Sequence, residues 1–516
     1  MKPRDQTIRT DLGSDAGSMA RGASVNLLGA LAANVLGFVY ILTVTHLVDV
    51  SSIGLVALGT TVVGFALIPS LLGLDTGLIR FVARGAASGD EQTARASFQV
   101  GLAVVCLTSV ALTVVIWILA PRIGQEFFHK PASTPILRIV SLSLPALALG
   151  RATMAAVQGF GVMGYPARLG VLRRIFEFAA VLPLIAVGLE ARALAWAGVV
   201  SAWASALVAL AFLRRVHAKA FVPARGAWPL WSLLNFSVPQ VMTATLFFFI
   251  IWTDTLLLGH YRSASEVGVY AIVGSLLVPA TVVSTAVGQM FAPRISAADA
   301  LGDRKTLAEM LKRVTHWNTA ISLPFFTALA LLSTAVLGVF GSRYTAGATA
   351  LTILALGQLL NTAAGPLGQV INMSGRQYLT MTNNAAVAGL NVLGCIVLIP
   401  RYGITGAACS TAAALTIVNA IKLVQVRIIF GMHPFQVSTL YLFASAAVAA
   451  AVAAPVAFLP GWPNYLVEAL VGGAVLFAVY SAIVWRIGVT EEDRELFVRG
   501  RDRLRRRGVR GVAVEG

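Results

Sequence analysis

The stretch IGLVALGTTVVGFALIPSLL (Ile53–Leu72) contains 20 successive residues without one charged side chain. An α-helix of that length spans about 30 Å, which is the thickness of the hydrocarbon core of a bilayer. Lipid offers no hydrogen-bond partner to an open backbone, and the stretch lacks the alternating pattern of a membrane β-barrel strand. It therefore predicts a transmembrane α-helix.

Further apolar runs of similar length recur from one end of the chain to the other. They are Gly22–Leu47, Ala94–Ile118, Leu137–Val157, Ala167–Leu189, Ala193–Leu213, Leu230–Leu258, Val267–Phe291, Thr315–Phe340, Ala346–Ile371, Tyr378–Ile399, Gly403–Ile429, Phe435–Phe458 and Tyr465–Trp485. The first run is too long for the apolar part of a cleaved signal peptide, so we expect it to remain as a helix. The sequence predicts an all-α polytopic membrane protein of about 14 transmembrane helices.

The composition agrees with a lipid environment. Hydrophobic residues make up 57% of the 516 residues and charged residues 12%, about half of the ~25% that is usual in soluble proteins. None of the lysines follows a glycine, so the P-loop of an ATPase is absent. The histidines and the three cysteines lack metal-ligand spacing. We expect no metal and no cofactor.

The basic residues predict the orientation of the chain. With the amino terminus in the cytoplasm, 31 of the 39 lysines and arginines fall in cytoplasmic segments, and seven fall in outer loops. This asymmetry follows the positive-inside rule and predicts that both termini are cytoplasmic. The net charge of +17 could indicate nucleic-acid binding, but the Arg-rich segment Arg494–Arg510 follows the last helix. There it favours anionic lipids as the partner and not nucleic acid.

The chain repeats itself at an offset near 213 residues. SSIGLVALG around Gly54 resembles SEVGVYAIVG around Gly268, and Gly89-Asp90 resembles Gly302-Asp303. Each copy contains six runs, an even number, so the copies are parallel repeats of one orientation. The predicted domains are a cytoplasmic tail (1–21), two pseudo-repeated six-helix lobes (22–225 and 226–430), two C-terminal helices (431–487) and a basic cytoplasmic tail (488–516).

Three segments resemble a known family. They are GLDTGLIRFVARGAASGDEQTAR (Gly73–Arg95), DTLLLGHYRSASEVGVY (Asp254–Tyr270) and RYGITGAACSTA (Arg401–Ala412). They resemble the polysaccharide and O-antigen flippases, in the superfamily that includes multidrug and toxin extrusion antiporters and lipid II flippases. The resemblance covers essentially the whole chain, although no single motif in it is specific. It implies a transporter in the bacterial cytoplasmic membrane that moves a polyprenyl-diphosphate-linked oligosaccharide between leaflets.

Charged residues inside the predicted helices are candidates for substrate binding, because an ion in hydrocarbon is costly unless it faces protein or water. Arg151 could face a cavity and bind a diphosphate, or it could extend to the cytoplasmic interface. Arg173 and Arg174 lie four and three residues before Glu177, which places both near that carboxylate. Glu177 balances one of the two arginines, so one positive charge remains, which could contribute to a cationic cytoplasmic vestibule that receives an anionic headgroup. The structural alternative is that these residues form a local ion pair and a positive-inside anchor.

Other charged residues are candidates for gating or ion coupling. Asp254 could bind a proton or cation, although we favour a structural role near the outer interface. We expect Asp75 to form an ion pair with Arg80 and Arg84 at the cytoplasmic end of the second helix, and Arg294 occupies the matching repeat position.

The function that the sequence favours is a flippase for a lipid-linked anionic glycan that works by alternating access. Glycan polymerase and export proteins are the further partners that we expect. The alternatives are a cation-coupled multidrug antiporter and a flippase of the lipid II type. A membrane-embedded glycan polymerase is disfavoured because no outer loop is large enough to hold its catalytic site. We therefore expect a transporter and not an enzyme.

Overall fold

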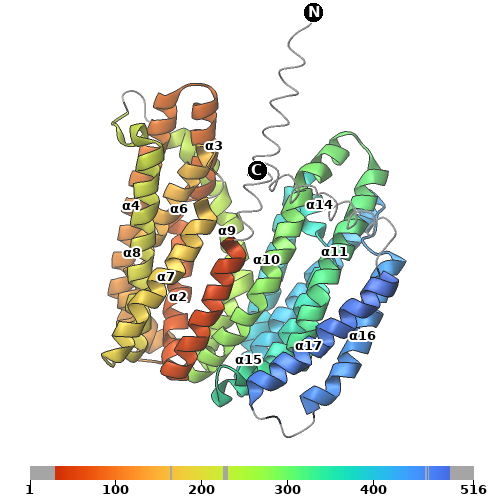
Figure 1. The fold of residues 1–516 in the computed structure, drawn as a ribbon. Helices are drawn as coiled ribbons and strands as arrows, with labels where there is room; N and C mark the ends of the chain where they lie inside the picture. The colour runs from red at the N-terminus through yellow and green to blue at the C-terminus, as the bar shows by residue number, and fades with distance from the viewer. Residues whose placement is uncertain (1–28, 163–164, 225–229, 459–461, 463, 489–516) are drawn as a thin grey trace, which may run out of the picture. The chain divides into compact units, whose positions relative to one another are not determined.

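The computed structural model describes residues 29–162, 165–224, 230–458, 462 and 464–488, and every element in these residues is helical (Figure 1). A first helix, Gly29–Leu47, carries no label. The labelled α-helices are α2 (Val50–Leu71), α3 (Leu74–Ala87), α4 (Glu91–Arg122), α5 (Ser133–Ser141), α6 (Leu144–Gly159), α7 (Tyr165–Ala186), α8 (Glu190–Val216), α9 (Leu230–Tyr261), α10 (Ala264–Ala300), α11 (Arg304–Leu331), α12 (Ser333–Gly338), α13 (Ala348–Ala363), α14 (Leu367–Met373), α15 (Gln377–Phe430), α16 (Val437–Phe458) and α17 (Tyr465–Ile483). Short π or 3₁₀ turns are η1 (Ile123–Phe127), η2 (Ala218–Phe221), η3 (Ser342–Gly347) and η4 (Val484–Gly488).

The all-α fold predicted from the sequence is confirmed, and the described part of each predicted run lies mainly on one or more of these helices. Within the described residues, 11 helical stretches are long and apolar enough to cross a membrane. One of them, Tyr378–Phe430, joins two predicted runs through a kink at Gly403, whose φ is 57°. The runs on α7 and α11 are not among the 11. The count of fourteen therefore stays a prediction.

Several predicted runs are interrupted, and other helices satisfy the freed carbonyl groups. The run Leu137–Val157 divides into α5 and α6, and the carbonyl of Leu142 accepts a hydrogen bond from the indole N–H of Trp203 on α8 at 3.1 Å. α2 ends at Leu71, where the Thr108 hydroxyl of α4 donates to the carbonyl of Ser70 at 2.6 Å. Such pairing permits a break inside a membrane, because lipid could not supply the missing partner.

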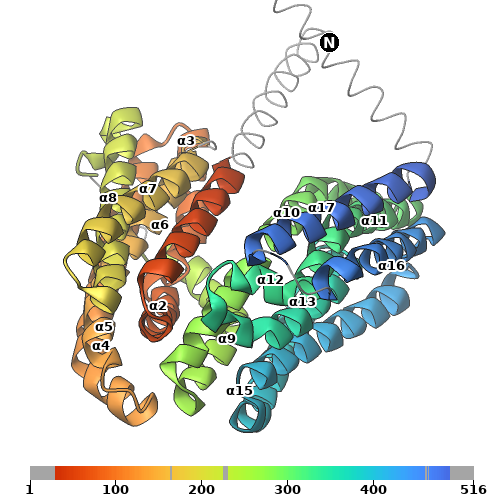
Figure 2. The ribbon, with the colours of Figure 1, turned by 60° about the horizontal axis from the view of Figure 1, so that its bottom comes forward.

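The helices form two compact units. Unit 1 comprises Met1–Pro279, Phe340–Ala350 and Met381–Ala414, and unit 2 comprises the remainder. In unit 1, α9 packs on α2, α3 and α4, around a core that includes Leu74 and Leu144. In unit 2, α16 packs on α11 and α17, as Figures 1 and 2 both show. The predicted lobe boundary at 225/226 and the two tails, 1–21 and 488–516, lie at least partly outside the described residues and stay predictions.

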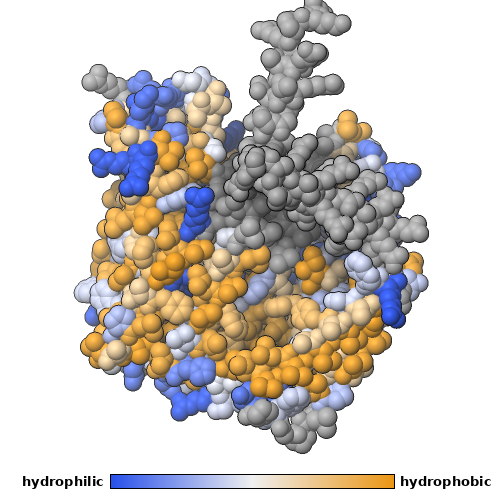
Figure 3. Space-filling model, in the orientation of Figure 1, coloured by the Kyte–Doolittle hydropathy of each residue, from blue (hydrophilic) through white to orange (hydrophobic). Residues whose placement is uncertain are grey.

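The outer surface of the helices is apolar. Figure 3 shows hydrophobic residues over the sides of the helices and hydrophilic residues gathered near one end of unit 1. On α4, Leu107 is 74% exposed and Ile118 is 65% exposed. Side chains of this kind contact lipid at no cost but would be unfavourable in water. The protein is therefore a multi-pass membrane protein.

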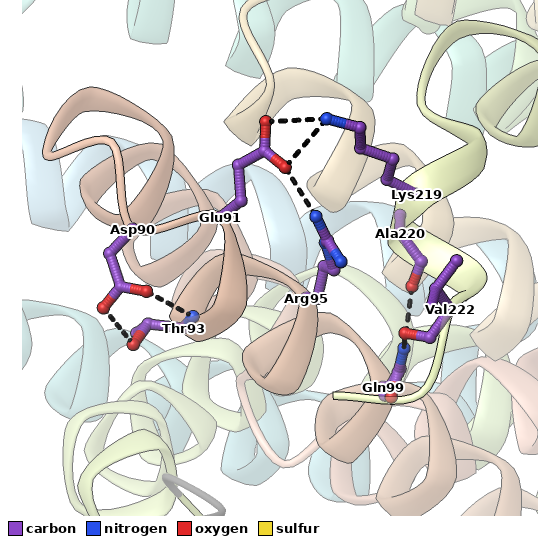
Figure 4. Close-up of polar contacts among 8 residues, drawn as sticks. All are labelled: Asp90, Glu91, Thr93, Arg95, Gln99, Lys219, Ala220 and Val222. Atoms are coloured by element: carbon purple, nitrogen blue, oxygen red, sulfur yellow. Dashed lines mark hydrogen bonds and ion pairs between the residues drawn. The ribbon is translucent and has the colours of Figure 1, made fainter. Parts of the chain in front are cut away.

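The sequence repeat reappears as two equivalent helix caps. Gly89 has a φ of 72°, and the Asp90 carboxylate that follows accepts a hydrogen bond from the Thr93 backbone N–H at 3.0 Å, which begins α4 (Figure 4). The Thr93 hydroxyl bonds the same carboxylate and, with that N–H, holds the pKa of Asp90 below its usual value. A carboxylate at this position stabilises a helix N-terminus.

The second copy of this cap begins α11. Gly302 has a φ of 67°, and Asp303 accepts a hydrogen bond from the Thr306 backbone N–H at 3.0 Å. The Thr306 hydroxyl and N–H likewise hold the pKa of Asp303 below its usual value. Glycine, aspartate and threonine recur 213 residues apart in the same conformation, as expected if the two halves are copies of one unit.

A single amide anchors the connection that leads from α8 toward α9. Gln99 on α4 donates from Nε2 to the carbonyls of Ala220 at 2.9 Å and Val222 at 2.6 Å (Figure 4). Its Oε1 accepts a hydrogen bond from the backbone N–H of Ala224 at 3.1 Å. One side chain thus satisfies three backbone groups of a segment that has little regular structure of its own.

An ion-pair cluster lies beside this anchor. Glu91 contacts Arg95 at 2.5 Å and Lys219 at 3.3 Å, the second contact joining α4 to η2. The Lys219 side chain is 73% exposed. Pairs of this kind contribute little in water, because solvent and salt screen them.

We expect Gln99→Leu to lower the free energy of unfolding by about 1–2 kcal/mol, because two part-buried backbone groups and one exposed group would lose their partner. Thermal unfolding of the detergent-solubilised protein measures this effect. The matched control is Glu91→Gln, which removes the neighbouring ion pairs and is expected to leave the unfolding midpoint close to that of the wild type. Equal midpoints for Gln99→Leu and the wild type would show that the connection is not anchored there.

Candidate functional site

A cavity of about 860 Å³ lies within unit 1, between the first helix, α2, α3, α6, α7 and α8. Two residues of α10, Ala271 and Ile272, complete its wall. The polar and charged side chains that line it are Tyr40, Thr60, Asp75, Thr76, Ser143, Arg151, Gln158, Arg173, Glu177 and Ser205. A charged cavity at membrane depth is the property expected of a binding site for a polar substrate.

Small residues provide the space for this cavity. Gly150, Gly170, Gly198, Ala146 and Ala202 all line it. A Cβ atom added at Gly198 would meet nothing within 4 Å. Larger side chains at these positions would fill the volume that the polar groups now surround.

Arg151 and Arg173 bring two guanidinium groups to the cavity. Arg151 lies on α6 and Arg173 on α7, and both residues are exposed within a wall that is otherwise largely apolar. Arg173 is close enough to Arg151, Arg174 and Glu177 to interact electrostatically with each of them. Arg151 thus lies in the cavity wall, and its binding of a diphosphate stays a prediction.

Arg174 and Glu177 form the local ion pair of α7. Nη1 of Arg174 lies 2.8 Å from Oε2 of Glu177, and the Glu177 side chain is 14% exposed. Glu177 lines the cavity, whereas Arg174 does not. The sequence placed both arginines beside Glu177, but of the two only Arg174 lies within ion-pair distance of it. The Arg174 guanidinium also lies against Gly37 of the first helix. Arg173 therefore keeps its charge available to the cavity.

The predicted ion pair of Asp75 with Arg80 and Arg84 is not formed among these three described residues. Asp75 lies in the first turn of α3 and lines the cavity. Arg80 instead stacks on the ring of Phe236, with its Cζ 4.3 Å from the ring centroid. Residues five and nine positions after Asp75 lie on other faces of a helix, which explains the error. The side chain of Arg294, on α10, lies outside the described residues.

Asp254 lies in a buried polar cluster on α9 and does not line the cavity. Its carboxylate accepts hydrogen bonds from the Tyr270 hydroxyl at 2.6 Å, the Thr255 backbone N–H at 2.7 Å and the Thr411 hydroxyl at 3.2 Å. Charged groups that leave water need such partners. The Thr255 hydroxyl is a fourth donor, at 3.4 Å. Four donors satisfy most of the acceptor capacity of one carboxylate, which favours the structural role over an exchangeable site.

The polar cluster continues through groups that the sequence reasoning did not identify. The fully buried Asn391 accepts from Ser410 through Oδ1 at 3.0 Å, and its Nδ2 donates to the carbonyl of Ile250 on α9 at 3.1 Å. Within the cavity, Tyr40 and Gln158 were also missed. A neutral polar residue inside an apolar run was the available signal, but it is common and points to no particular partner.

Metal-ligating groups do not gather in the described part of the chain. No group of three or more histidine, cysteine or carboxylate side chains lies close enough there to hold an ion. The expectation that the protein uses no metal stays a prediction.

Comparison with known proteins places the chain in a family. The family model described as polysaccharide biosynthesis protein matches residues 43–348. The chain is also 24% identical over 373 residues to the probable low-salt glycan biosynthesis flippase Agl15 of Haloferax volcanii, covering 71% of this chain and 75% of the relative.

Solved structures of transporters share the fold. The lipid II flippase MurJ, in an inward closed conformation, has a TM-score of 0.66 at 14% identity, covering 89% of this chain and 99% of MurJ. A multidrug resistance MATE family transporter of the MOP superfamily, in an inward-facing conformation, has a TM-score of 0.60 at 15% identity, covering 79% of this chain and 94% of the transporter. The resemblance predicted from the sequence is confirmed. The chain belongs to the polysaccharide biosynthesis protein family, with the fold of the MurJ and MATE transporters.

Proposed function

We propose that this protein moves a polyprenyl-diphosphate-linked oligosaccharide from the inner to the outer leaflet of the bacterial cytoplasmic membrane. The observation that carries the proposal is the pair of arginines, Arg151 and Arg173, in the wall of one cavity. Guanidinium groups bind phosphate oxygens through two parallel hydrogen bonds, and the attraction is strong where water is scarce. The polyprenyl chain remains in lipid while the cavity holds the charged headgroup.

The name of the Haloferax relative, a probable glycan biosynthesis flippase, supports a glycan as the transported group. The protein then acts as a transporter and not an enzyme, alternating the access of its cavity between the two leaflets. Both termini lie in the cytoplasm, where the basic segment Arg494–Arg510 contacts anionic lipids. Glycan polymerase and export proteins are the expected partners on the outer side. No role for nucleic acid is proposed.

A cation-coupled multidrug antiporter is the second candidate. It is favoured by the two carboxylates, Asp75 and Glu177, that line the same cavity, since an acidic group can exchange a cationic drug for a proton or metal ion. Glu177 is already paired with Arg174, which leaves Asp75 alone for this role. A flippase of the lipid II type would use the arginines as proposed here, with another glycan.

Deletion of the gene tests the proposal. We expect complete lipid-linked repeat units to accumulate in the inner leaflet, because synthesis continues while transport stops. Mass spectrometry of extracted lipids measures the accumulation, and expression of the intact chain from a plasmid should reverse it. A deletion strain with unchanged lipid-linked glycans and increased sensitivity to cationic drugs would favour the antiporter instead.

A further inference from the structure

Two glycines allow α2 and α10 to cross in backbone contact. A Cβ atom added at Gly54 on α2 would overlap the carbonyl oxygen of Ala264 and lie 2.8 Å from the backbone nitrogen of Gly268. A Cβ atom added at Gly268 on α10 would overlap the carbonyl oxygen of Val50. No other residue type fits at either position without moving a helix, because the obstructing atoms belong to the backbone.

The contact is reciprocal and matches the sequence repeat. Gly54 meets Ala264, and Gly268 meets Val50. The offset between Val50 and Ala264 equals the offset between Gly54 and Gly268, which are the equivalent glycines of the two repeat copies. Each helix therefore presents the same surface to the other, as in a contact about a twofold axis.

The crossing lies at one end of the cavity. On α2, Ile53, Val56 and Ala57 line the cavity within one turn of Gly54. On α10, Ala271 and Ile272 line it within one turn of Gly268. The charge distribution predicts that this end, where both helices begin, faces the outside. Substrate in the cavity cannot leave toward this end while the two backbones touch.

An ion pair accompanies the crossing. Asp49, the residue that caps the N-terminus of α2, contacts Arg343 at 2.5 Å, although 294 residues separate them. The Arg343 side chain is 75% exposed. A solvent-exposed pair is weak, so it favours the closed arrangement without preventing its opening.

We propose that the crossing of α2 and α10 at Gly54 and Gly268 is the outer gate of the cavity. The inference rests on the proposed function only in assuming that a substrate exits on this side. Among the described residues, no buried ion pair joins α2 to α10, and the two helices meet at this crossing through backbone contact and dispersion at the two glycines. Such a contact separates at small cost and closes again in one defined register, which suits a gate that opens in every cycle.

Accessibility of the cavity from outside tests the gate. The reporter is Thr60→Cys, on the cavity wall of α2, in a chain whose native cysteines are replaced by alanine. A membrane-impermeant maleimide is applied to intact cells. We expect Gly54→Ala and Gly268→Ala to raise the labelling rate about tenfold, because overpacking at backbone disfavours the closed state.

The same two helices supply the controls. A Cβ atom added at Gly274 of α10 would meet nothing within 4 Å, and one at Gly59 of α2, which does not line the cavity, would meet side chains of Val140 and Ile136, at 3.4 Å or more. Gly274→Ala and Gly59→Ala should therefore leave the labelling rate unchanged. Equal labelling in the gate variants and these controls would overturn the proposal.

A second variant decides the matter if the gate glycine variants fail to reach the membrane. Arg343→Glu changes an exposed side chain and places two negative charges together at Asp49. We expect outside labelling of the reporter to rise severalfold, and Arg343→Lys to return it to the wild-type rate. Wild-type labelling in Arg343→Glu, when the glycine variants are not inserted, would refute the gate.

These readings are independent of the transported molecule. Labelling of the cysteine reporter requires no substrate. If the gate variants label like the wild type while the deletion strain accumulates lipid-linked glycan, the gate is refuted and the proposed substrate is not. Increased labelling without any change in lipid-linked glycan upon deletion refutes the proposed substrate alone.

Discussion

Replacing Arg151 and Arg173 together with alanine is expected to reduce glycan export at least about a hundredfold. Each charge-assisted hydrogen bond to a phosphate contributes about 1.5–3 kcal/mol, and losing two of them corresponds to a factor of about 100 or more. Both side chains reach into the cavity and neither forms an ion pair within 4 Å among the described residues. Export is measured as surface glycan per cell at equal protein levels in the membrane.

The matched control for this double variant is Arg174→Ala on the same helix. From the sequence, Arg173 and Arg174 would have been the pair to replace together, but Arg174 is bound to Glu177 and does not line the cavity. We expect its removal to reduce export far less than the double substitution. The double variant with lysine should retain part of the activity, because charge remains while the bidentate geometry is lost. Full export by the alanine double variant would exclude this pair as the headgroup site.

Replacing Asp254 with alanine is expected to lower the free energy of unfolding by about 2–4 kcal/mol, because the Tyr270 and Thr411 hydroxyls would lose a buried acceptor. Both hydroxyls belong to other helices, α10 and α15, so the carboxylate joins three helices at one point. The midpoint of thermal unfolding in detergent measures the loss.

Asp254→Asn separates this structural role from ion coupling. Asparagine keeps one acceptor oxygen and nearly the same shape, and its amide can donate to hydroxyls that formerly donated to the carboxylate. We therefore expect a smaller loss of stability than with alanine and a transport rate close to that of the wild type. A stable Asp254→Asn protein without transport would instead assign the carboxylate to coupling, since only its ability to carry a charge would have changed. Tyr270→Phe should cost less stability than Asp254→Ala, because it removes one of the four donors.

Hydropathy predicted the helices well because lipid requires apolar side chains along the whole length of a span. The run Ile53–Leu72 differs from α2 by three residues at its start and one at its end. The same requirement explains why the run Leu137–Val157 concealed the break between α5 and α6. The carbonyl of Leu142 at that break is satisfied by Trp203, a partner on another helix that no local pattern reveals.

The candidate site was predicted in part, for a similar reason. Charge within a span is rare and identified Arg151, Arg173 and Glu177, all of which line the cavity. Asp75 was expected in an ion pair with Arg80 and Arg84, but all three lie on α3, where spacings of five and nine residues place them on different faces.

The partners of Asp254 show the limit of sequence reasoning most directly. Thr411 lies 157 residues further along the chain, and its hydroxyl is chemically ordinary. Only the packing of α15 on α9 gives that hydroxyl its role.

The caps at Asp90 and Asp303 show what the two predicted repeat copies have in common. The positive-φ glycine, the aspartate and the threonine recur in both halves, while the helices that follow them differ at most positions. A turn between helices that depends on only three local residues keeps its geometry when the other residues of those helices change. Under the predicted duplication, each half could then change its interior residues independently. The bundle could acquire an asymmetric distribution of charge while its helices still crossed the membrane in the same order.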